Sequence, residues 1–411
     1  MPLQDAKCRR SRGKGDDKGV DGCVQRKAAG SGRVPSRIAP VAGSGRARKT
    51  VRDLSAAQKA GKGRSAPPRP WLCSEGSPDA IYLARHVGLR VGVPVAVPAL
   101  TVNRLCGSGF QSIANGCQEI CLKESEVVLC GGAENMSQSP YAVRNIRFGT
   151  KLGTDVKLED TLWTGLTDLH IKTPMAITAE NLAAKYSITK EECDRYALKS
   201  QQRWKAADEA GHFKAEMAPI EVKTRKGKQL MERDEHPRPN TTMEELGKLP
   251  LVFKKDGTVT AGNASGISDG AGAVVLASED AVKKHNLSPL ARIVSYHAVG
   301  CDPNIMGIGP VPAITEALKK AGLSLKDMDL VEVNEAFAPQ YLAVEKVLGL
   351  NPEKTNVNGG AIALGHPLGA SGTRIAAHLV HELRRRGGKY AMGSACIGGG
   401  QGIAVVIENA A

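Results

Sequence analysis

The feature that most constrains the fold of this chain is a pattern that occurs twice. Around residues 98–132, a strand-like run leads through the triplet TVN and a glycine-containing turn into a helix, a strand and two glycines. Around residues 354–400 the same order recurs, with NVN for TVN and three glycines at the end. We expect each copy to form one βα half of a pseudo-symmetric α/β fold, with both turns facing one centre.

Hydrophobic periodicity predicts the elements of these halves. The first is expected to contain a helix at 78–89, a buried strand at 95–102, a helix at 107–122 and a strand at 126–130. Because strands and helices alternate, we predict a largely parallel sheet. The second copy predicts the helix 372–386 and the strand 390–395.

The stretch between the copies has a different character, with helical patterns at 178–185 and 190–210 and few strand-like runs. We interpret it as an inserted, mostly helical loop domain. The predicted division is residues 1–75 as an extension, 76–135 with 262–284 as the first half, 136–261 as the loop domain, and 285–411 as the second half.

The extension carries almost all of the charge. Of the net charge of +14, all but one unit arises within residues 1–70, which contain no Glu, and the rest of the chain is close to neutral. Because this segment has no apolar periodicity, we expect residues 1–75 to be a disordered basic extension. Four Asp residues before position 22 make it a weak mitochondrial targeting signal. A hydrophobic fraction of 41% without any apolar run of membrane-spanning length indicates a globular protein without a transmembrane segment.

Cys106 is the first candidate for chemistry. It lies in Leu-Cys-Gly-Ser-Gly, between a predicted strand and a predicted helix. A thiol at a helix N-terminus has a lowered pKa, and the small residues after it allow a substrate to approach the backbone. The alternative is a buried structural cysteine.

Three further candidates lie at the other turns and strand ends. His366, on the second turn, is a candidate base for Cys106, and the alternative is an ordinary turn histidine. Cys396 ends a predicted strand and is a candidate general acid/base. Asn334 also ends a strand, where it is placed to hold a water or a carbonyl, while Glu335 serves equally well as a helix cap.

Several other classes of site are disfavoured. The chain has no CxxC pair, no complete GxGxxG after a strand and no Walker sequence, so we predict neither a zinc site nor a dinucleotide fold. His378 and His381, three apart on the helix 372–386, are interpreted as surface residues rather than metal ligands.

Taken together, four blocks of sequence resemble the signature motifs of the thiolase family, and the similarity is greatest to its mitochondrial members of fatty-acid β-oxidation. These blocks are NRLCGSG around Cys106, NEAFA at 334–338, GHPLGASG at 365–372 and CIGGGQG at 396–402. The resemblance implies cleavage of 3-ketoacyl-CoA by CoA to acetyl-CoA and a shortened acyl-CoA, through an acyl group on Cys106. It also implies a homodimer or homotetramer, a mitochondrial location, and CoA as co-substrate without any metal or cofactor.

The family's roles fall on matching positions of this chain. His366 would activate Cys106, and Cys396 would protonate the leaving enolate and then deprotonate CoA. One oxyanion hole would be formed by His366 and an Asn334-held water, the other by the amides of Cys106 and Gly398. CoA would bind the loop domain at positions matching Arg238, Thr241 and Ser265.

The chain departs from the family at its amino end, where we expect the first strands of the fold to be missing and the basic extension to stand in their place. Three alternatives therefore remain open. They are an acetoacetyl-CoA thiolase, a non-catalytic acyl-CoA-binding protein whose first half is disrupted, and a nucleic-acid binder acting through residues 1–70, although we expect no nucleic-acid partner.

Overall fold

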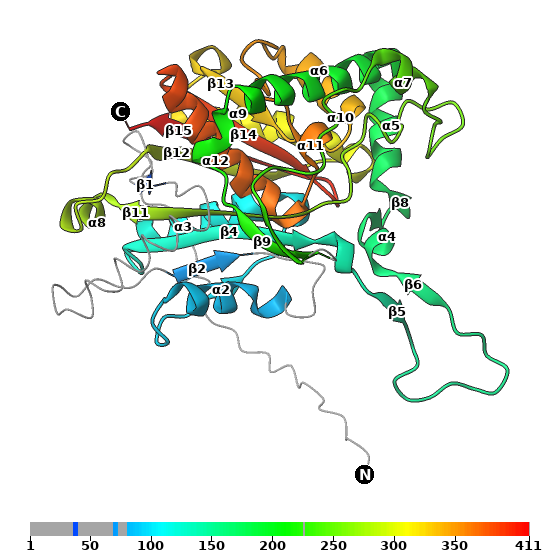
Figure 1. Ribbon diagram of the computed structural model, residues 1–411, viewed down its shortest axis with the longest axis horizontal. Coiled ribbons are helices and arrows are strands. Elements are labelled where there is room, and N and C mark those ends of the chain that lie inside the picture. Colours follow the sequence, from blue (N-terminus) through cyan, green and yellow to red (C-terminus); the bar gives the residue numbers. More distant parts are fainter. Residues whose placement is uncertain (1–35, 40–68, 73–79, 225–226, 411) are drawn as a thin grey trace, which may run out of the picture. The chain divides into compact units, whose positions relative to one another are not determined.

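The computed structural model describes residues 36–39, 69–72, 80–224 and 227–410 (Figure 1). Within them, one sheet has nine strands in the order β13-β14-β15-β12-β1-β11-β4-β2-β3. The strands are β1 (Ser36–Ala39), β2 (Arg69–Leu72), β3 (Leu100–Thr101), β4 (Val127–Asn135), β11 (Asp269–Ser278), β12 (Ala291–Gly300), β13 (Leu330–Val333), β14 (Tyr390–Ile397) and β15 (Gln401–Asn409).

The sheet is mixed, so the expectation of a largely parallel sheet is wrong. The pairs β13–β14, β2–β3 and β2–β4 are parallel. In contrast, β4 pairs antiparallel with β11, and β14 pairs antiparallel with β15. Each half therefore ends in a strand that returns beside its predecessor, which the alternation of strands and helices does not reveal.

The two predicted copies are present as equivalent units. In the first, α3 (Ser108–Cys121) leads to β4 and then to β11; in the second, α12 (Leu368–Arg386) leads to β14 and then to β15. The difference lies in the connection. The short turn at Gly398–Gly400 joins β14 to β15, whereas the whole loop domain joins β4 to β11.

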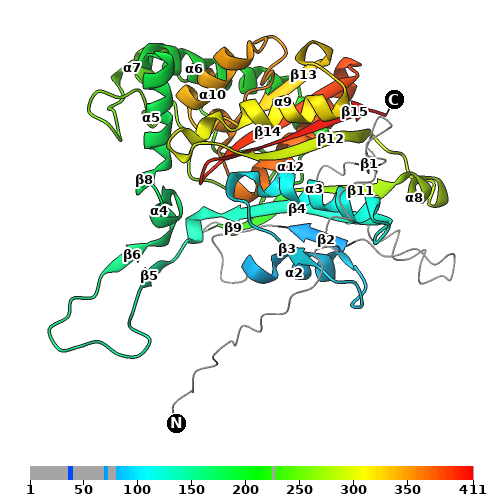
Figure 2. The same cartoon turned by 180° about the vertical axis from the view of Figure 1, so that it is seen from behind.

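Helices α3 and α12 form the central layer, between the strands of the two halves (Figures 1 and 2). Val128 and Cys130 of β4 face this layer, while Val127 and Leu129 point to the opposite side, as the two-residue period of a strand requires. The helices cross at a pair of glycines. A Cβ on Gly109 would lie 2.5 Å from the amide nitrogen of Thr373, so no larger residue fits there.

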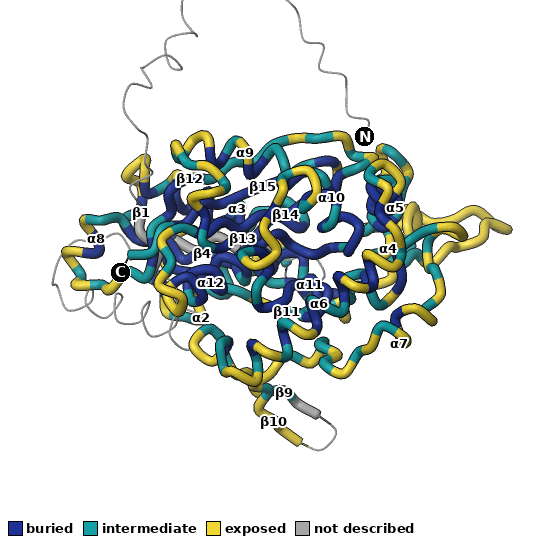
Figure 3. The backbone as a smooth tube through the Cα atoms, turned by 90° about the horizontal axis from the view of Figure 1, so that it is seen from above, coloured by how far each residue is buried: buried dark blue, intermediate teal, exposed yellow. Residues whose placement is uncertain are grey.

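The loop domain packs on the outer face of the second half. Together with α9 (Pro310–Ala321) and α10 (Ala338–Leu348), its helices α5 (Met175–Tyr186) and α6 (Lys190–Glu209) cover the strands β12 to β15. Strands β13, β14 and β15 are buried along most of their length, whereas β12 is buried at Ala291 and at 293–295 only (Figure 3). The domain also contains α4 (Thr161–Gly165), α7 (Met243–Lys248) and the hairpins β5–β6 (Tyr141–Val143 and Leu158–Asp160), β7–β8 (Thr167–Asp168 and Thr173–Pro174) and β9–β10 (Ile220–Thr224 and Gly227–Met231).

Among the described residues, fewer helices cover the outer face of the first half. It is packed by α2 (Leu83–Val91) and α8 (Glu279–Lys284). The predicted strand 95–102 shortens to β3, and its Val95 is 77% exposed. Pro94 and Pro98 explain the difference, because a proline has no amide hydrogen to donate to a neighbouring strand.

Two segments of the basic extension belong to the sheet. β1 pairs with β11 and β12, and β2 pairs with β3 and β4. The expectation of disorder over residues 1–75, and of missing first strands, is therefore wrong for these two segments. Sheet hydrogen bonds use backbone groups, so a sequence without apolar periodicity can still supply a strand. The remainder of the extension lies outside the described residues.

Candidate active site

Cys106 lies in the turn η3 (Leu105–Gly107), directly before α3, as predicted. The turn is tight, because Leu105 adopts a left-handed conformation with φ of 47°. Ser108 closes it, since its hydroxyl donates to Leu105 O at 2.7 Å and accepts from the Arg104 amide at 2.9 Å. The thiol side chain is 9% exposed, so the turn presents it at the edge of the core.

Cys396 and the turn that follows it meet the Cys106 turn from the second half. A Cβ on Gly398 would lie 3.0 Å from Leu105 Cδ1, which places these two turns against each other. Burial raises the pKa of the Cys396 thiol well above its ordinary value, and Cys106 and Cys301 raise it further. Cys396 is therefore a protonated thiol at neutral pH, placed near Cys106 and able to donate a proton.

Asn334 joins this centre from the neighbouring strand. It directly follows β13, and its amide donates to Ser394 O at 2.9 Å, which continues the β13–β14 ladder to within two residues of Cys396. Its side-chain Nδ2 lies 3.2 Å from His366 Nε2. Asn334 Oδ1 is buried and has no hydrogen-bond partner among the described residues, which leaves an acceptor for a water or a substrate.

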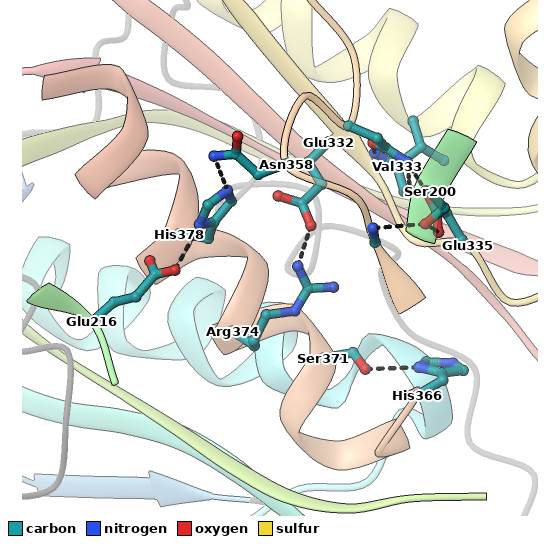
Figure 4. Close-up of polar contacts among 12 residues, drawn as sticks. Ser200, Glu216, Glu332, Val333, Glu335, Asn358, His366, Ser371, Arg374 and His378 are labelled. Atoms are coloured by element: carbon teal, nitrogen blue, oxygen red, sulfur yellow. Dashed lines mark hydrogen bonds and ion pairs between the residues drawn. The ribbon is translucent and has the colours of Figure 1, made fainter. Parts of the chain in front are cut away.

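His366 is 4% exposed and is held at both ring nitrogens. Its Nδ1 lies 2.7 Å from Ser371 Oγ, and that hydroxyl donates to Pro367 O at 3.0 Å (Figure 4). If Nδ1 carries the proton, Nε2 has a single in-plane lone pair, which accepts from Asn334 in this structure. Burial, assisted by the positive charge of Arg374, lowers the pKa of His366 to about 3. The ring is therefore neutral at physiological pH, the state that a base requires.

Of the three residues predicted to bind CoA, Ser265 contacts the segment after Asn334, and Arg238 and Thr241 lie beside Gln201 of α6. Ser265 donates from its amide and its hydroxyl to Ala336 O, at 3.1 and 2.9 Å, two residues after Asn334. The exposed Arg238 donates its amide to Gln201 Oε1 at 2.8 Å, and its carbonyl accepts from the Thr241 amide. Their roles toward CoA stay predictions.

The interpretation of His378 as a surface residue is wrong. The residue is 5% exposed, and its ring nitrogens lie 2.7 Å from Glu216 Oε1 and 3.2 Å from Asn358 Nδ2 (Figure 4). Burial alone would lower its pKa, but Glu216 outweighs burial and raises the pKa to about 9. The signal was available, because Ser371, Ile375 and His378 recur at the spacing of one buried helix face.

Glu335 is not a helix cap either. Helix α10 begins at Ala338 without any side-chain cap, and Glu335 is fully buried and accepts hydrogen bonds from three other parts of the chain. No sequence pattern pointed to this role, because its partners lie between 21 and 139 residues away.

Two absences hold for the residues that the structure describes. In this part of the chain, no three His, Cys, Asp or Glu side chains are grouped so that they could hold a metal ion. Among the same residues, no helix combines the length and apolarity needed to cross a membrane.

Comparison with known proteins gives a consistent result. Bovine (Bos taurus) mitochondrial 3-ketoacyl-CoA thiolase is 79% identical over 337 residues, which cover 82% of this chain and 85% of that protein. The crystal structure of human mitochondrial 3-ketoacyl-CoA thiolase superimposes with a TM-score of 0.83 at 69% identity, over 92% of this chain and 98% of that chain. The same human enzyme in complex with CoA gives a TM-score of 0.82 at 68% identity, over 92% and 97% of the two chains.

Family matches cover both halves. Residues 73–280 match the thiolase N-terminal domain, and residues 287–409 match the thiolase C-terminal domain. With the repeat, the paired turns and the two thiols already described, these matches lead to one conclusion: the chain belongs to the thiolase family.

Proposed function

We propose that this chain is a mitochondrial acyltransferase that cleaves 3-ketoacyl-CoA with CoA, giving acetyl-CoA and an acyl-CoA shortened by two carbons. The relatives with 77–79% identity are named for this activity and this compartment. One observation carries the proposal. Cys106 lies close enough to Cys396 to raise the pKa of the Cys396 thiol, and both lie beside a buried Asn334–His366 pair.

In the first step, the lone pair of His366 Nε2 gives up its hydrogen bond from Asn334 and takes the proton of Cys106, and the Cys106 thiolate attacks the 3-keto carbon. The developing oxyanion is stabilised by protonated His366 and a water held at Asn334 Oδ1. The C2–C3 bond then breaks, and its electron pair forms the enolate of acetyl-CoA. Cys396 gives its proton to C2, acetyl-CoA leaves, and the acyl group stays on Cys106 as a thioester.

In the second step, the Cys396 thiolate takes the proton of free CoA, and the CoA thiolate attacks the acyl-Cys106 carbonyl. The amides of Cys106 and Gly398 stabilise this second oxyanion. Cys106 leaves as a thiolate and recovers its proton from His366, which restores every group. The cycle needs no metal ion and no redox cofactor, because CoA is a substrate and each proton is returned.

CoA binding is assigned to the loop domain. The exposed Arg238 suits the nucleotide phosphates, because a guanidinium binds phosphate through paired hydrogen bonds. Thr241 lies beside Arg238, and its amide donates to the Arg238 carbonyl. Ser265 lies beside the Asn334 segment, where its hydroxyl donates to Ala336 O. This arrangement supports a path for the pantetheine arm between the nucleotide site and Cys106.

Peptide mass spectrometry after incubation with a 3-ketoacyl-CoA tests the proposal. We expect acylation of Cys106 alone in the wild-type chain, and loss of both acylation and thiolysis in Cys106→Ala. Thiolysis that survives Cys106→Ala would exclude the mechanism. Cleavage restricted to acetoacetyl-CoA would favour the biosynthetic alternative, and CoA binding without turnover would favour a non-catalytic binding protein.

Assembly into a homodimer or homotetramer is part of the proposal. Phe148 and Leu152, in the loop between β5 and β6, are 98% and 107% exposed, and Ile81 and Leu122 of the first half are also exposed. An interface between subunits would cover exposed apolar side chains of this kind. Multi-angle light scattering tests this point, and a monomeric mass would contradict it.

A further inference from the structure

Glu335 is a fully buried acid that the reaction above does not use. It directly follows Asn334, and its carboxylate accepts four hydrogen bonds (Figure 4 shows its contact with Ser200). Tyr196 Oη and Asn356 Nδ2 donate to Oε1 at 2.7 and 3.0 Å. Ser200 Oγ and the Ile362 amide donate to Oε2 at 2.7 and 3.1 Å. Such a set of donors compensates the cost of burying a carboxylate.

These donors come from the elements that surround the candidate site. Tyr196 and Ser200 lie on α6 of the loop domain. Ile362 lies in α11 (Ala361–Leu364), the short helix that leads into the His366 turn. One carboxylate therefore connects α6, the Asn334 strand end and the approach to His366.

The same helix also reaches the predicted CoA site. Gln201, next to Ser200, donates to Ile362 O at 3.4 Å and accepts from the Arg238 amide at 2.8 Å. A continuous series of hydrogen bonds thus runs from the Arg238 segment through α6 to Glu335.

We propose that Glu335 is a positioning residue, which holds Asn334 and the His366 turn in the geometry of the oxyanion hole and fastens both to the loop domain. The inference rests on the proposed function, because that function gives Asn334 and His366 their roles. It goes beyond that function in assigning catalytic importance to a side chain that touches no substrate.

The geometry predicts that glutamine, which has the same shape as glutamate, cannot replace Glu335 in this set of hydrogen bonds. Asn356 cannot reverse its amide, because Oδ1 accepts from the Val333 amide and Nδ2 donates to Val333 O, each at 2.9 Å. The Ile362 amide is backbone and can only donate. A glutamine NH₂ must therefore face one of two fixed N–H donors, whereas the Tyr196 and Ser200 hydroxyls can rotate. Two N–H donors that face each other in the core repel. The repulsion displaces either Asn356, next to the Asn334 strand end, or Ile362, on the approach to His366.

The test is Glu335→Gln, with turnover expressed per reactive Cys106. Iodoacetamide labelling followed by mass spectrometry counts the Cys106 thiols of folded protein. We expect kcat per labelled site to fall on the order of 100-fold, as small displacements of catalytic groups do, with less than about a two-fold change in KM for CoA. A role limited to stability would reduce the number of sites and leave kcat per site unchanged, which would overturn the proposal.

Glu180→Gln is the matched control. Glu180 is also a buried carboxylate on a loop-domain helix, and it accepts from the backbone amides of Thr258 and Val259, but it has no contact with Asn334 or the His366 turn. We expect it to lower the melting temperature without changing kcat per site. An equal fall in kcat per site for both variants would also overturn the proposal.

Two further measurements keep the outcome decisive. If Glu335→Gln does not fold, Ser200→Ala removes one donor and keeps the carboxylate; kcat per site should fall several-fold, and an unchanged value would contradict the proposal. If the wild-type chain shows no thiolysis, the proposed function fails by itself. The rate of Cys106 alkylation then reads the positioning of His366 directly, and equal rates in wild type and Glu335→Gln would refute it.

Discussion

The two turns that precede α3 and α12 occupy equivalent places in the repeat, but they are held in different ways. The Cys106 turn is closed by its neighbour Ser108 and by the left-handed backbone at Leu105, and Arg104 beside it donates to Gln401 Oε1 of the second half at 2.6 Å. At the His366 turn the ring itself is held, locally by Ser371 and from a distance by Asn334, while Glu335 holds the approach to the turn through α11.

This difference corresponds to what each turn does in the proposed reaction. A nucleophile must form a bond to its substrate, so its turn needs an accessible edge. A base must keep one tautomer and one orientation through two proton transfers, which requires a fixed partner for its Nδ1–H, here the Ser371 hydroxyl. The same repeated unit thus presents a nucleophile in one half and a base in the other. The side chains that contact each turn account for the difference.

The largest expected effect comes from removing the residue that the second turn presents. His366→Ala should lower kcat/KM for thiolysis by roughly 10²–10⁴-fold, the usual contribution of a general base. Because the pKa of His366 is lowered to about 3, the rate of Cys106 alkylation between pH 5 and 8 should show no titration near pH 6.5. An inflection near pH 6.5 that disappears in His366→Ala would contradict a neutral, fully buried ring.

A smaller effect is expected from Ser371→Ala, which removes the partner of His366 Nδ1. The loss of one buried hydrogen bond, worth about 1.4 kcal/mol, corresponds to about 10-fold in kcat/KM. Ser371→Thr, which keeps the hydroxyl, should retain most of the activity. Nitrogen-15 NMR of the His366 ring provides the independent reading, and an Nε2–H tautomer in the wild-type chain would remove the basis of this prediction.

The smallest effect on catalysis, but a measurable one on stability, is expected further along α12. The pKa of His378 is raised to about 9 by Glu216, so this pair stabilises the fold fully below pH 6.5 and loses its contribution as the pH rises through 9. The shift corresponds to a free energy of unfolding on the order of 3 kcal/mol. Urea unfolding at pH 7 and pH 10 should therefore differ more for the wild type than for His378→Gln. Equal differences would show that the pair does not anchor α12.

Much of the fold could be read from local patterns. The positions of α3, α12, β4 and β14 and the turns bearing Cys106 and His366 all follow from periodicity, glycines and the repeated triplets. Each of these features is local, because it depends on residues that lie within about one helix or strand of each other in the sequence.

Only the tertiary structure decided which residues become partners when they lie far apart in the sequence. The burial of His378 against Glu216, the four donors around Glu335 and the antiparallel return of β11 beside β4 involve separations of 21 to 162 residues or a whole inserted domain. The same holds for β1 and β2, whose sequence has no strand pattern but whose backbone finds unpaired neighbours in the sheet. By itself, the sequence determined which residues carry reactive groups and which elements bear them, because both depend on side-chain identity and local spacing. How those groups are held was decided by long-range packing, because hydrogen-bond partners are selected by proximity in space rather than along the chain.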